Sequence, residues 1–349
     1  MKALFLTGKS QVEYRETPTP ACPEDGLLLI VEAVGLCGSD IRTYTHGHSQ
    51  VSYPCILGHE NAGVVVAVGA NAPGNYKIGD ALVVHPAVPC GTCYYCRNGM
   101  ESICENLIVV GSGIPGGFAQ YMVIPKLLLE KGTLIRMPEG ISFDRIVIAE
   151  LLGSVIRAQK QLDIGLGETV VIIGTGPIGC LHSEIARLRG ASRIILINHS
   201  AGRLELARNH SSGTHFINSS EEDPVKKVLE LTDGRGADAV ISASPSTEAV
   251  AQGLKMLRKE GRLSVFGGFN KEAPELHLDG NLIHYRRLSI IGAYSYSAAD
   301  FEQGVKLIAE GRINTDLVTH HLPLKEMEKG VELIQSGKAL KVVLLPQEE

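Results

Sequence analysis

The 349-residue chain lacks the long apolar runs that a membrane protein requires. No window approaches a transmembrane span, and the apolar run in the N-terminal stretch MKALFLTGKS is too short for a secretory signal. We therefore expect a cytoplasmic protein without a membrane partner, whose cysteine thiols stay reduced.

The chain also lacks internal repeats, low-complexity tracts, a charged tail and any concentration of basic residues. Lys and Arg number 33 against 38 Asp and Glu, and they are scattered, so we expect no nucleic-acid partner. The apolar fraction of 44% is ordinary for a globular protein with a core. The length predicts about two domains.

Cysteine, by contrast, is concentrated. Four of the eight cysteines lie in PCGTCYYCRNGMESICEN, residues 89–106: Cys90, Cys93, Cys96 and Cys104. A chain of this size does not need disulfides, and the spacing Cys-x2-Cys-x2-Cys-x7-Cys lets four thiolates converge on one metal ion. Four protein ligands leave no open position, which indicates a structural zinc. An iron–sulfur cluster is the alternative.

Hydrophobic patterning divides the chain into two parts. From residue 1 to about 130, short apolar stretches broken by Gly and Pro predict an antiparallel, barrel-like lobe. From about 168 to 294, apolar strands alternate with helical stretches, which predicts an α/β fold with a parallel, doubly wound, six-stranded sheet. We expect its strands at 169–174, 193–198, 215–218, 237–243, 262–267 and 288–293. A last strand, KVVLLP, is expected to return to the first lobe.

The first strand of the second part runs directly into the motif GTGPIG. Gly174, Gly176 and Gly179 form a G-x-G-x-x-G pattern between a strand and a helix, with Pro177 and Ile178 inside it. The first glycine permits a tight turn, the second lets a pyrophosphate approach the backbone, and the third allows close helix–sheet packing. The helix N-terminus favours the negative charge. These five residues predict a nicotinamide-dinucleotide site.

The second strand ends in Asn198, where such sites usually carry an acidic residue for the adenosine ribose. Asn198 can still bond a ribose hydroxyl, but it has no charge that repels a 2′-phosphate. His199 and Arg203 follow closely and could receive that phosphate. Arg203 could instead stack beside the adenine or lie on a solvated helix face. NAD and NADP therefore both remain open as cofactors.

A second metal signal occurs in the first part, in GLCGSDIRTYTHG and LGHENAG. Cys37, His59 and Glu60 offer one thiolate, one imidazole and one carboxylate. A catalytic zinc site has few protein ligands and an open position. Singly, each residue would be unremarkable, but together with a dinucleotide domain they indicate a catalytic metal.

The motifs CGSD, GHE, the four-cysteine loop and GTGPIG, in this order, resemble the zinc-dependent medium-chain alcohol dehydrogenases, most closely the sorbitol (polyol) and threonine dehydrogenase branch. The resemblance covers the whole chain. It implies a GroES-like catalytic domain at 1–154, a Rossmann domain at 155–294, and a segment at 295–349 that rejoins the catalytic domain. The active site would be the cleft between the two domains.

The resemblance also assigns two zinc ions per chain. Cys37 and His59 match ligands of the catalytic zinc. Glu150 matches the polyol branch's glutamate, which reaches the metal directly or through water. Glu60 matches an adjacent carboxylate that is a ligand in some states. The four-cysteine loop matches the structural zinc lobe.

Other positions match roles around the metal. Asp40 fits the residue that holds the other ring nitrogen of His59, and Ser39 fits the hydroxyl that passes on the substrate proton. Many relatives have a histidine where this chain has Arg42, which cannot act as an ordinary base. Either the proton relay ends in water, or Arg42 binds an anionic group, or it simply faces solvent. Arg42 and Tyr44 are candidates for the substrate side.

The implied function is oxidation of a secondary alcohol of a polyol, sugar, sugar acid or sugar phosphate to a ketone, with hydride transfer to NAD or NADP. The implied partners are a small-molecule alcohol and further copies of the chain, in a homodimer or homotetramer. An L-threonine-type or other secondary alcohol dehydrogenase is the alternative. The zinc-free quinone reductases are a further enzyme alternative, which is disfavoured because they lack both cysteine sets. A non-catalytic NAD(P)H- and zinc-binding protein of the same fold is a third possibility.

Overall fold

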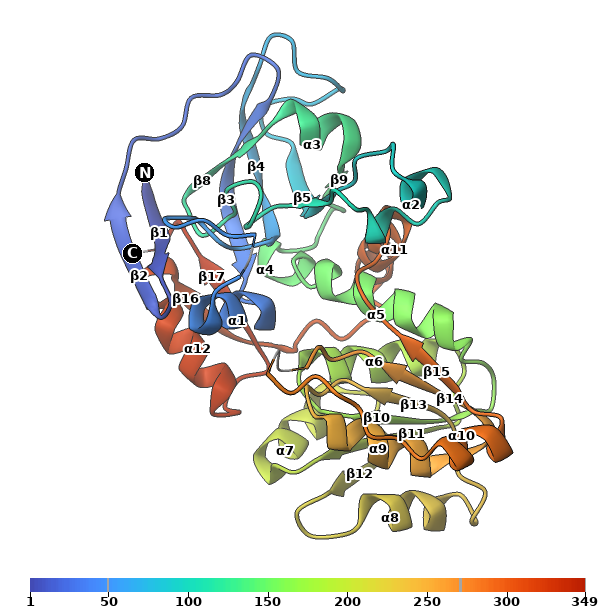
Figure 1. Cartoon of the computed structure of the whole chain (residues 1–349). Coiled ribbons are helices and arrows are strands. Elements are labelled where there is room, and N and C mark those ends of the chain that lie inside the picture. Colours follow the sequence, from blue (N-terminus) through green and yellow to red (C-terminus); the bar gives the residue numbers. More distant parts are fainter. Residues whose placement is uncertain (49, 270–271, 349) are drawn as a thin grey trace. The chain divides into compact units, whose positions relative to one another are not determined.

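The computed structural model describes residues 1–48, 50–269 and 272–348. The chain forms two compact units (Figure 1). The first comprises Met1–Glu150 and Tyr296–Glu349, and the second comprises Leu151–Ser295. In the described part of the chain, no helix combines the length and apolarity that crossing a membrane requires.

The first unit is built on a seven-stranded sheet in the order β16-β17-β3-β4-β5-β9, with β8 also paired to β3. Two-stranded sheets, β1-β2 and β6-β7, accompany it. Its strands are β1 (Lys2–Gly8), β2 (Gln11–Glu16), β3 (Leu27–Gly35), β4 (Glu60–Val68), β5 (Ala81–His85), β6 (Ala87–Val88), β7 (Ile108–Val109), β8 (Tyr121–Ile124), β9 (Thr133–Arg136), β16 (Val318–Pro323) and β17 (Lys341–Leu345). Its helices are α1 (Gly38–His46), α2 (Tyr94–Arg97), η1 (Glu101–Ile103), α3 (Lys126–Lys131), α4 (Phe143–Ile146), α11 (Ala298–Ala309), η2 (Leu324–Glu326) and α12 (Met327–Gln335).

The C-terminal strand β17 belongs to this sheet. It pairs antiparallel with β3 through Val343 and Gly35, and parallel with β16. Figure 1 shows β17, in red, beside β3, in blue, although they lie at opposite ends of the sequence. Residues from the end of the chain therefore contribute to the interior of the first unit, and Lys341, Val342 and Leu344 are all buried.

The second unit is a parallel sheet with the strand order β12-β11-β10-β13-β14-β15. Numbered within the unit, this order is 3-2-1-4-5-6, that of the Rossmann fold. The strands are β10 (Thr169–Ile173), β11 (Arg193–Asn198), β12 (His215–Asn218), β13 (Ala237–Ser242), β14 (Leu257–Val265) and β15 (Ser289–Gly292). The helices are α6 (Pro177–Leu188), α7 (Ala201–His210), α8 (Pro224–Leu231), α9 (Thr247–Met256) and α10 (Gly280–Arg286), and α5 (Ala149–Leu162) leads in. The predicted α/β class and six-stranded parallel sheet are confirmed.

One strand differs from the prediction. β14 begins at Leu257 rather than at Arg262. Its register with β13 shifts, because Ala237 pairs with Leu257 whereas Ala239 pairs with Arg262. The intervening Glu260 has a φ of 59°, in the left-handed region. The polar run between the two pairings has no strand periodicity, so the sequence pattern could not show this start.

Candidate active site

The ends of two neighbouring strands bring Cys37 and His59 together. In the antiparallel pair β3-β4, Gly35 lies opposite Glu60. Cys37 follows β3 by two residues and serves as the N-cap of α1, while His59 immediately precedes β4. The register of this strand pair therefore accounts for the proximity of residues that lie more than twenty positions apart in sequence.

Asp40 links these two residues. Its Oδ2 accepts a hydrogen bond from the backbone N–H of Cys37 at 3.0 Å, and its Oδ1 lies 3.3 Å from His59 Nδ1. Burial lowers the pKa of His59, but the charges of Asp40 and Cys37 more than offset this and hold the pKa above its usual value. A carboxylate at Nδ1 orients the ring and leaves Nε2 for a metal. Ser39 Oγ lies 3.5 Å from that Nε2.

The ligand atoms of Cys37, His59 and Glu60 all lie within 4.8 Å of one another. Glu60 is fully buried, and its Oε1 has no hydrogen-bond partner. A buried carboxylate oxygen without a partner is costly, and a cation would compensate it. Thiolate, imidazole and carboxylate together form a donor set that suits zinc. These residues thus fit a zinc ion.

Glu150 lies outside this three-residue group. Its Oε1 accepts a 2.7 Å hydrogen bond from the hydroxyl of Tyr296, which packs edge-to-face on His85 at a ring distance of 5.2 Å. Burial raises the pKa of Glu150, although the charge of His59 opposes this effect. The described geometry therefore brings Glu60, rather than Glu150, together with Cys37 and His59.

A buried lysine completes the surroundings of Glu60. Lys341 Nζ lies 2.5 Å from Glu60 Oε2 and donates to the carbonyl of Leu36 at 3.0 Å. Burial lowers the pKa of Lys341, but the charges of Glu60 and Cys37 outweigh burial and raise it. Lys341 therefore stays protonated beside Glu60.

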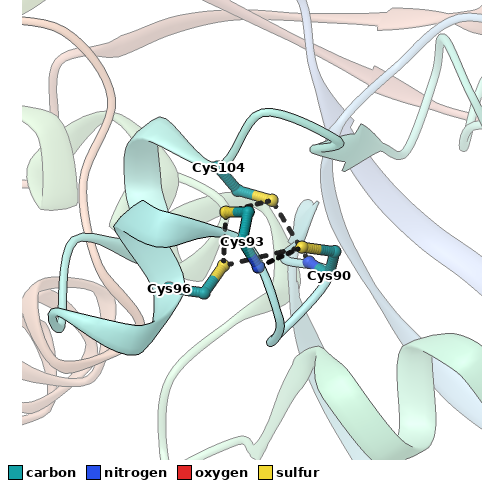
Figure 2. A group of neighbouring side chains, drawn as sticks. All are labelled: Cys90, Cys93, Cys96 and Cys104. Atoms are coloured by element: carbon teal, nitrogen blue, oxygen red, sulfur yellow. Dashed lines mark hydrogen bonds between the residues drawn. The ribbon is translucent and has the colours of Figure 1, made fainter.

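The four cysteines of the loop between β6 and β7 converge, as Figure 2 shows. Cys93 Sγ lies 3.5 Å from Cys96 Sγ and 3.9 Å from Cys104 Sγ, and Cys90 Sγ lies 3.9 Å from Cys96 Sγ. Sulfur ligands at about 2.3 Å from a tetrahedral zinc lie about 3.8 Å apart. The loop is therefore shaped to hold one metal ion.

Backbone N–H groups point at the sulfur atoms of this cluster. The N–H groups of Thr92 and Cys93 donate to Cys90 Sγ, and that of Cys90 donates to Cys104 Sγ at 3.2 Å. The bonds from Thr92 lower the pKa of Cys90 to about 5. Such donors stabilise the thiolate form, which is the form that binds metal.

In the second unit, the glycine motif lies between the ends of β10 and β13, where the strand order reverses. Gly174 has a φ of 107°, and a Cβ there would lie 2.8 Å from the carbonyl of Ala243. A Cβ on Gly179 would overlap the carbonyl of Gly174, whereas one on Gly176 would meet only Arg203 Nη1, at 3.9 Å. The open space at Gly176, where α6 begins at Pro177, suits a phosphate.

Asn198 faces this loop. Its Nδ2 donates to Thr175 Oγ1 at 2.9 Å, and its Oδ1 accepts from the backbone N–H of Ser200 at 2.9 Å. The exposed His199 follows it, and Arg203 lies in the first turn of α7, where burial lowers its pKa. The predicted residues Asn198 and Arg203 therefore both lie at the G-x-G loop, while Ile178 is half-buried in the first turn of α6.

The two substrate-side candidates lie on α1 but differ in their surroundings. Arg42 is exposed. Tyr44 donates a 2.7 Å hydrogen bond to Glu328 of α12, and this bond raises its pKa to about 12. Tyr44 thus joins α1 to α12, whereas Arg42 has no such tie among the contacts of the described residues.

Two neighbours of the metal site, Lys341 and Tyr296, were not identified from the sequence. The signal for Lys341 was a charged residue at the start of the apolar strand KVVLLP. Tyr296 offered no comparable signal. Lys341 could not be matched to Glu60 without the pairing of β17 with β3, and Tyr296 could not be matched to Glu150 without the tertiary structure.

Comparison with known proteins identifies the family to which the chain belongs. The model of the alcohol dehydrogenase GroES-like domain matches residues 23–139, and the model of the zinc-binding dehydrogenase family matches residues 177–310. Together they cover the four-cysteine loop, the cluster at Cys37 and most of the Rossmann unit.

Relatives match over nearly the whole chain. A sorbitol dehydrogenase of Halalkalibacterium halodurans is 32% identical over 351 residues, covering 99% of each chain. An L-threonine 3-dehydrogenase of Caldanaerobacter subterraneus subsp. tengcongensis is 33% identical, covering 94% of this chain and 93% of that one. The crystal structure of a zinc-binding dehydrogenase from Sinorhizobium meliloti 1021 bound to NADP is 27% identical, with a TM-score of 0.91 and 99% of both chains covered. The chain therefore belongs to the zinc-dependent medium-chain alcohol dehydrogenase family, in its sorbitol and threonine dehydrogenase branch, and is an NAD(P)-dependent oxidoreductase.

Proposed function

We propose that this enzyme oxidises a secondary alcohol of a polyol, sugar, sugar acid or sugar phosphate to a ketone. The observation that carries the proposal is the group of Cys37, His59 and Glu60, with ligand atoms within 4.8 Å of one another and the hydroxyl of Ser39 beside it. Few protein ligands leave a coordination position for substrate, which distinguishes this group from the closed four-cysteine site.

Each residue around the site has a separate task. When bound by Cys37, His59 and Glu60, zinc supplies a Lewis acid that stabilises negative charge on the substrate oxygen. Asp40 holds His59 through Nδ1 and fixes its orientation. Ser39 accepts the proton of the alcohol and passes it outward, with Arg42 outside this relay because a guanidinium group has no acceptor atom for a proton.

The second unit holds the hydride acceptor. The loop at Gly176 and the first turn of α6 bind the pyrophosphate, with Pro177 and Ile178 shaping that turn. Asn198, His199 and Arg203 face the adenosine ribose, and they admit both NAD and NADP. The bound nicotinamide supplies the acceptor chemistry of its ring.

The substrate class rests on the relatives. The sorbitol dehydrogenase relative supports a polyol. The test is a panel of polyols, sugar acids and sugar phosphates with NAD and NADP, in which formation of the reduced cofactor is measured. Turnover confined to simple primary alcohols would contradict the proposal.

A threonine-type activity is the second candidate, because an L-threonine 3-dehydrogenase matches over almost the same span at a similar identity. L-Threonine therefore belongs in the same panel, and a kcat/KM highest for L-threonine would favour this candidate. A protein that binds zinc and reduced cofactor but turns over no alcohol would instead be a non-catalytic relative.

We further propose that each chain holds two zinc ions, one at Cys37 and one at the four cysteines, and that the enzyme works in the cytoplasm, where thiolate ligands stay reduced. Glu150 is proposed to reach the metal through water, since Tyr296 occupies one of its oxygens. Metal analysis of the purified protein tests the stoichiometry.

We also propose a homodimer or homotetramer. Strand β15 ends the six-stranded sheet, and its residues Ser289 and Ile290 are exposed, as is nearby Tyr294. An exposed apolar edge strand is a template for pairing with another chain. Light scattering should give a mass of two or four chains, and Ile290→Lys should shift it toward one.

A further inference from the structure

Lys341 is the most unusual side chain of the last strand. It is 1% exposed, and the rest of β17 is apolar. A buried lysine is costly unless it is paired and hydrogen-bonded. Its Nζ meets both conditions, because it lies 2.5 Å from Glu60 Oε2 and donates to the carbonyl of Leu36 at 3.0 Å. The ammonium therefore holds Glu60 and the residue that immediately precedes Cys37.

The sheet makes room for this pair at Gly35. Gly35 lies between Glu60 of β4 and Val343 of β17 in the strand order β17-β3-β4. A Cβ at Gly35 would overlap Glu60 Oε2 and lie 3.0 Å from Lys341 Cε. The missing side chain on the central strand lets the two charged groups meet inside the sheet.

Lys341 contacts only one of the two carboxylate oxygens of Glu60. Both oxygens of Glu60 are buried without a hydrogen-bond partner, but Oε2 lies 2.5 Å from the ammonium of Lys341, whereas no ion pair among the described residues reaches Oε1. On the basis of the proposed function, we propose that Lys341 is a positioning residue of the metal site. It anchors Oε2, so Glu60 can offer the metal only Oε1, and a coordination position stays open for substrate.

The physical reason is that a free carboxylate can bind a metal through one oxygen or two. Without Lys341, both oxygens of Glu60 would be available to a cation held by Cys37 and His59. Two oxygens would occupy the position that substrate requires. Groups that orient a metal ligand typically change metal affinity or activity about 10–100-fold when they are replaced.

The test replaces the metal of the open site by Co²⁺, with zinc retained at the four cysteines, and compares wild type with Lys341→Met. We expect Lys341→Met to change the visible absorption of Co²⁺ toward the weaker bands of higher coordination. The kcat/KM of the zinc enzyme should fall about 10–100-fold. Lys341→Arg, which keeps the charge, should restore most of both. A wild-type Co²⁺ spectrum in Lys341→Met would overturn the proposal.

Lys341→Met could misfold, because it leaves Glu60 buried without its counter-charge. A double variant keeps the test usable in that case. In Glu60→Gln/Lys341→Met no buried charge is left unpaired. If Lys341 acts through Glu60, its replacement should leave the Co²⁺ spectrum of Glu60→Gln unchanged. An equal spectral change with and without Glu60 would overturn the proposal.

The behaviour of the wild-type enzyme distinguishes a failure of this inference from a failure of the proposed function. If wild type takes up no Co²⁺ outside the four cysteines or oxidises no alcohol, the proposed function fails. If wild type does both, and Lys341→Met is folded, retains zinc at the four cysteines and has a wild-type spectrum, only the role of Lys341 fails.

Discussion

Ser39 lies in the first turn of α1, with its Oγ 3.5 Å from His59 Nε2. If this hydroxyl takes the substrate proton, Ser39→Ala should lower kcat about 10²–10⁴-fold, the usual contribution of a positioned acid or base. The zinc content should not change, because Ser39 is not a ligand.

Thr45→Ala is the matched control for Ser39→Ala. It removes a hydroxyl from the same helix, and that hydroxyl donates only to the helix backbone at Ile41 and Arg42. Steady-state kinetics should show little change in Thr45→Ala. A Ser39→Ala enzyme with the kcat of wild type would mean that the proton leaves by another route.

Asn198, which we propose faces the adenosine ribose, has an uncharged side chain. An aspartate at this position could still accept from the backbone N–H of Ser200, although it could not donate to Thr175, and it would repel a 2′-phosphate. Asn198→Asp should therefore raise the preference for NAD by about 1–2 kcal/mol, chiefly through a higher KM for NADP. The ratio of kcat/KM for the two cofactors measures this effect.

Asn209→Asp makes the same change of charge on the exposed end of α7, where Asn209 bonds only the carbonyl of Glu205. This control should leave the cofactor ratio unchanged. An equal ratio in Asn198→Asp and wild type would show that residue 198 does not face the ribose.

In the loop from β6 to β7, the sulfur atoms of the four cysteines cluster where other elements have a hydrophobic core. Its helices α2 and η1 are one turn each, and Cys96 and Cys104 are the buried residues of the cluster. Since metal binding contributes folding energy, Cys93→Ser should destabilise the protein by more than the ~1 kcal/mol typical of a point substitution. It should also remove one zinc per chain.

Thermal unfolding and metal analysis test Cys93→Ser. The control is Cys22→Ser, because the thiol of Cys22 only approaches the carbonyls of Pro23 and Gly26, at 3.6 Å, which a hydroxyl can also do. A Cys93→Ser protein with two zinc ions would contradict the structural site.

At the scale of the whole molecule, stability should depend on pH through buried histidines. Burial lowers the pKa of His182, which is fully buried in α6, to about 3. The unfolded chain binds this proton below about pH 6.5, whereas the folded chain does not until about pH 3. Stability is therefore lost as the pH falls through this window, by about 2 kcal/mol near pH 5 for this histidine.

Urea unfolding near pH 8 and near pH 5 checks the sign. His182→Leu should lose less stability than wild type between these two conditions, because the variant has no proton to gain there on unfolding. The same loss in both proteins would mean that His182 is not the group that titrates.

The sequence by itself determined the cluster of four cysteines, the glycine motif and the α/β class. These features are local, since ligand spacing, glycine placement and the period of apolar residues are set within one or two elements. The continuous apolar run of β10, for example, is buried along its whole length, as parallel strands with both faces covered require. The start of β14 could not be predicted from the sequence, because its first residues have no local pattern of apolar residues.

Only the tertiary structure decided which partners surround the metal site. Lys341 meets Glu60 because β17 pairs with β3, and Tyr296 meets Glu150 because the chain returns to the first unit at Tyr296. Nothing near Glu60 in sequence specifies a lysine almost three hundred residues away. Its desolvated ammonium and carboxylate acquire their roles only once the strands that carry them lie in one sheet.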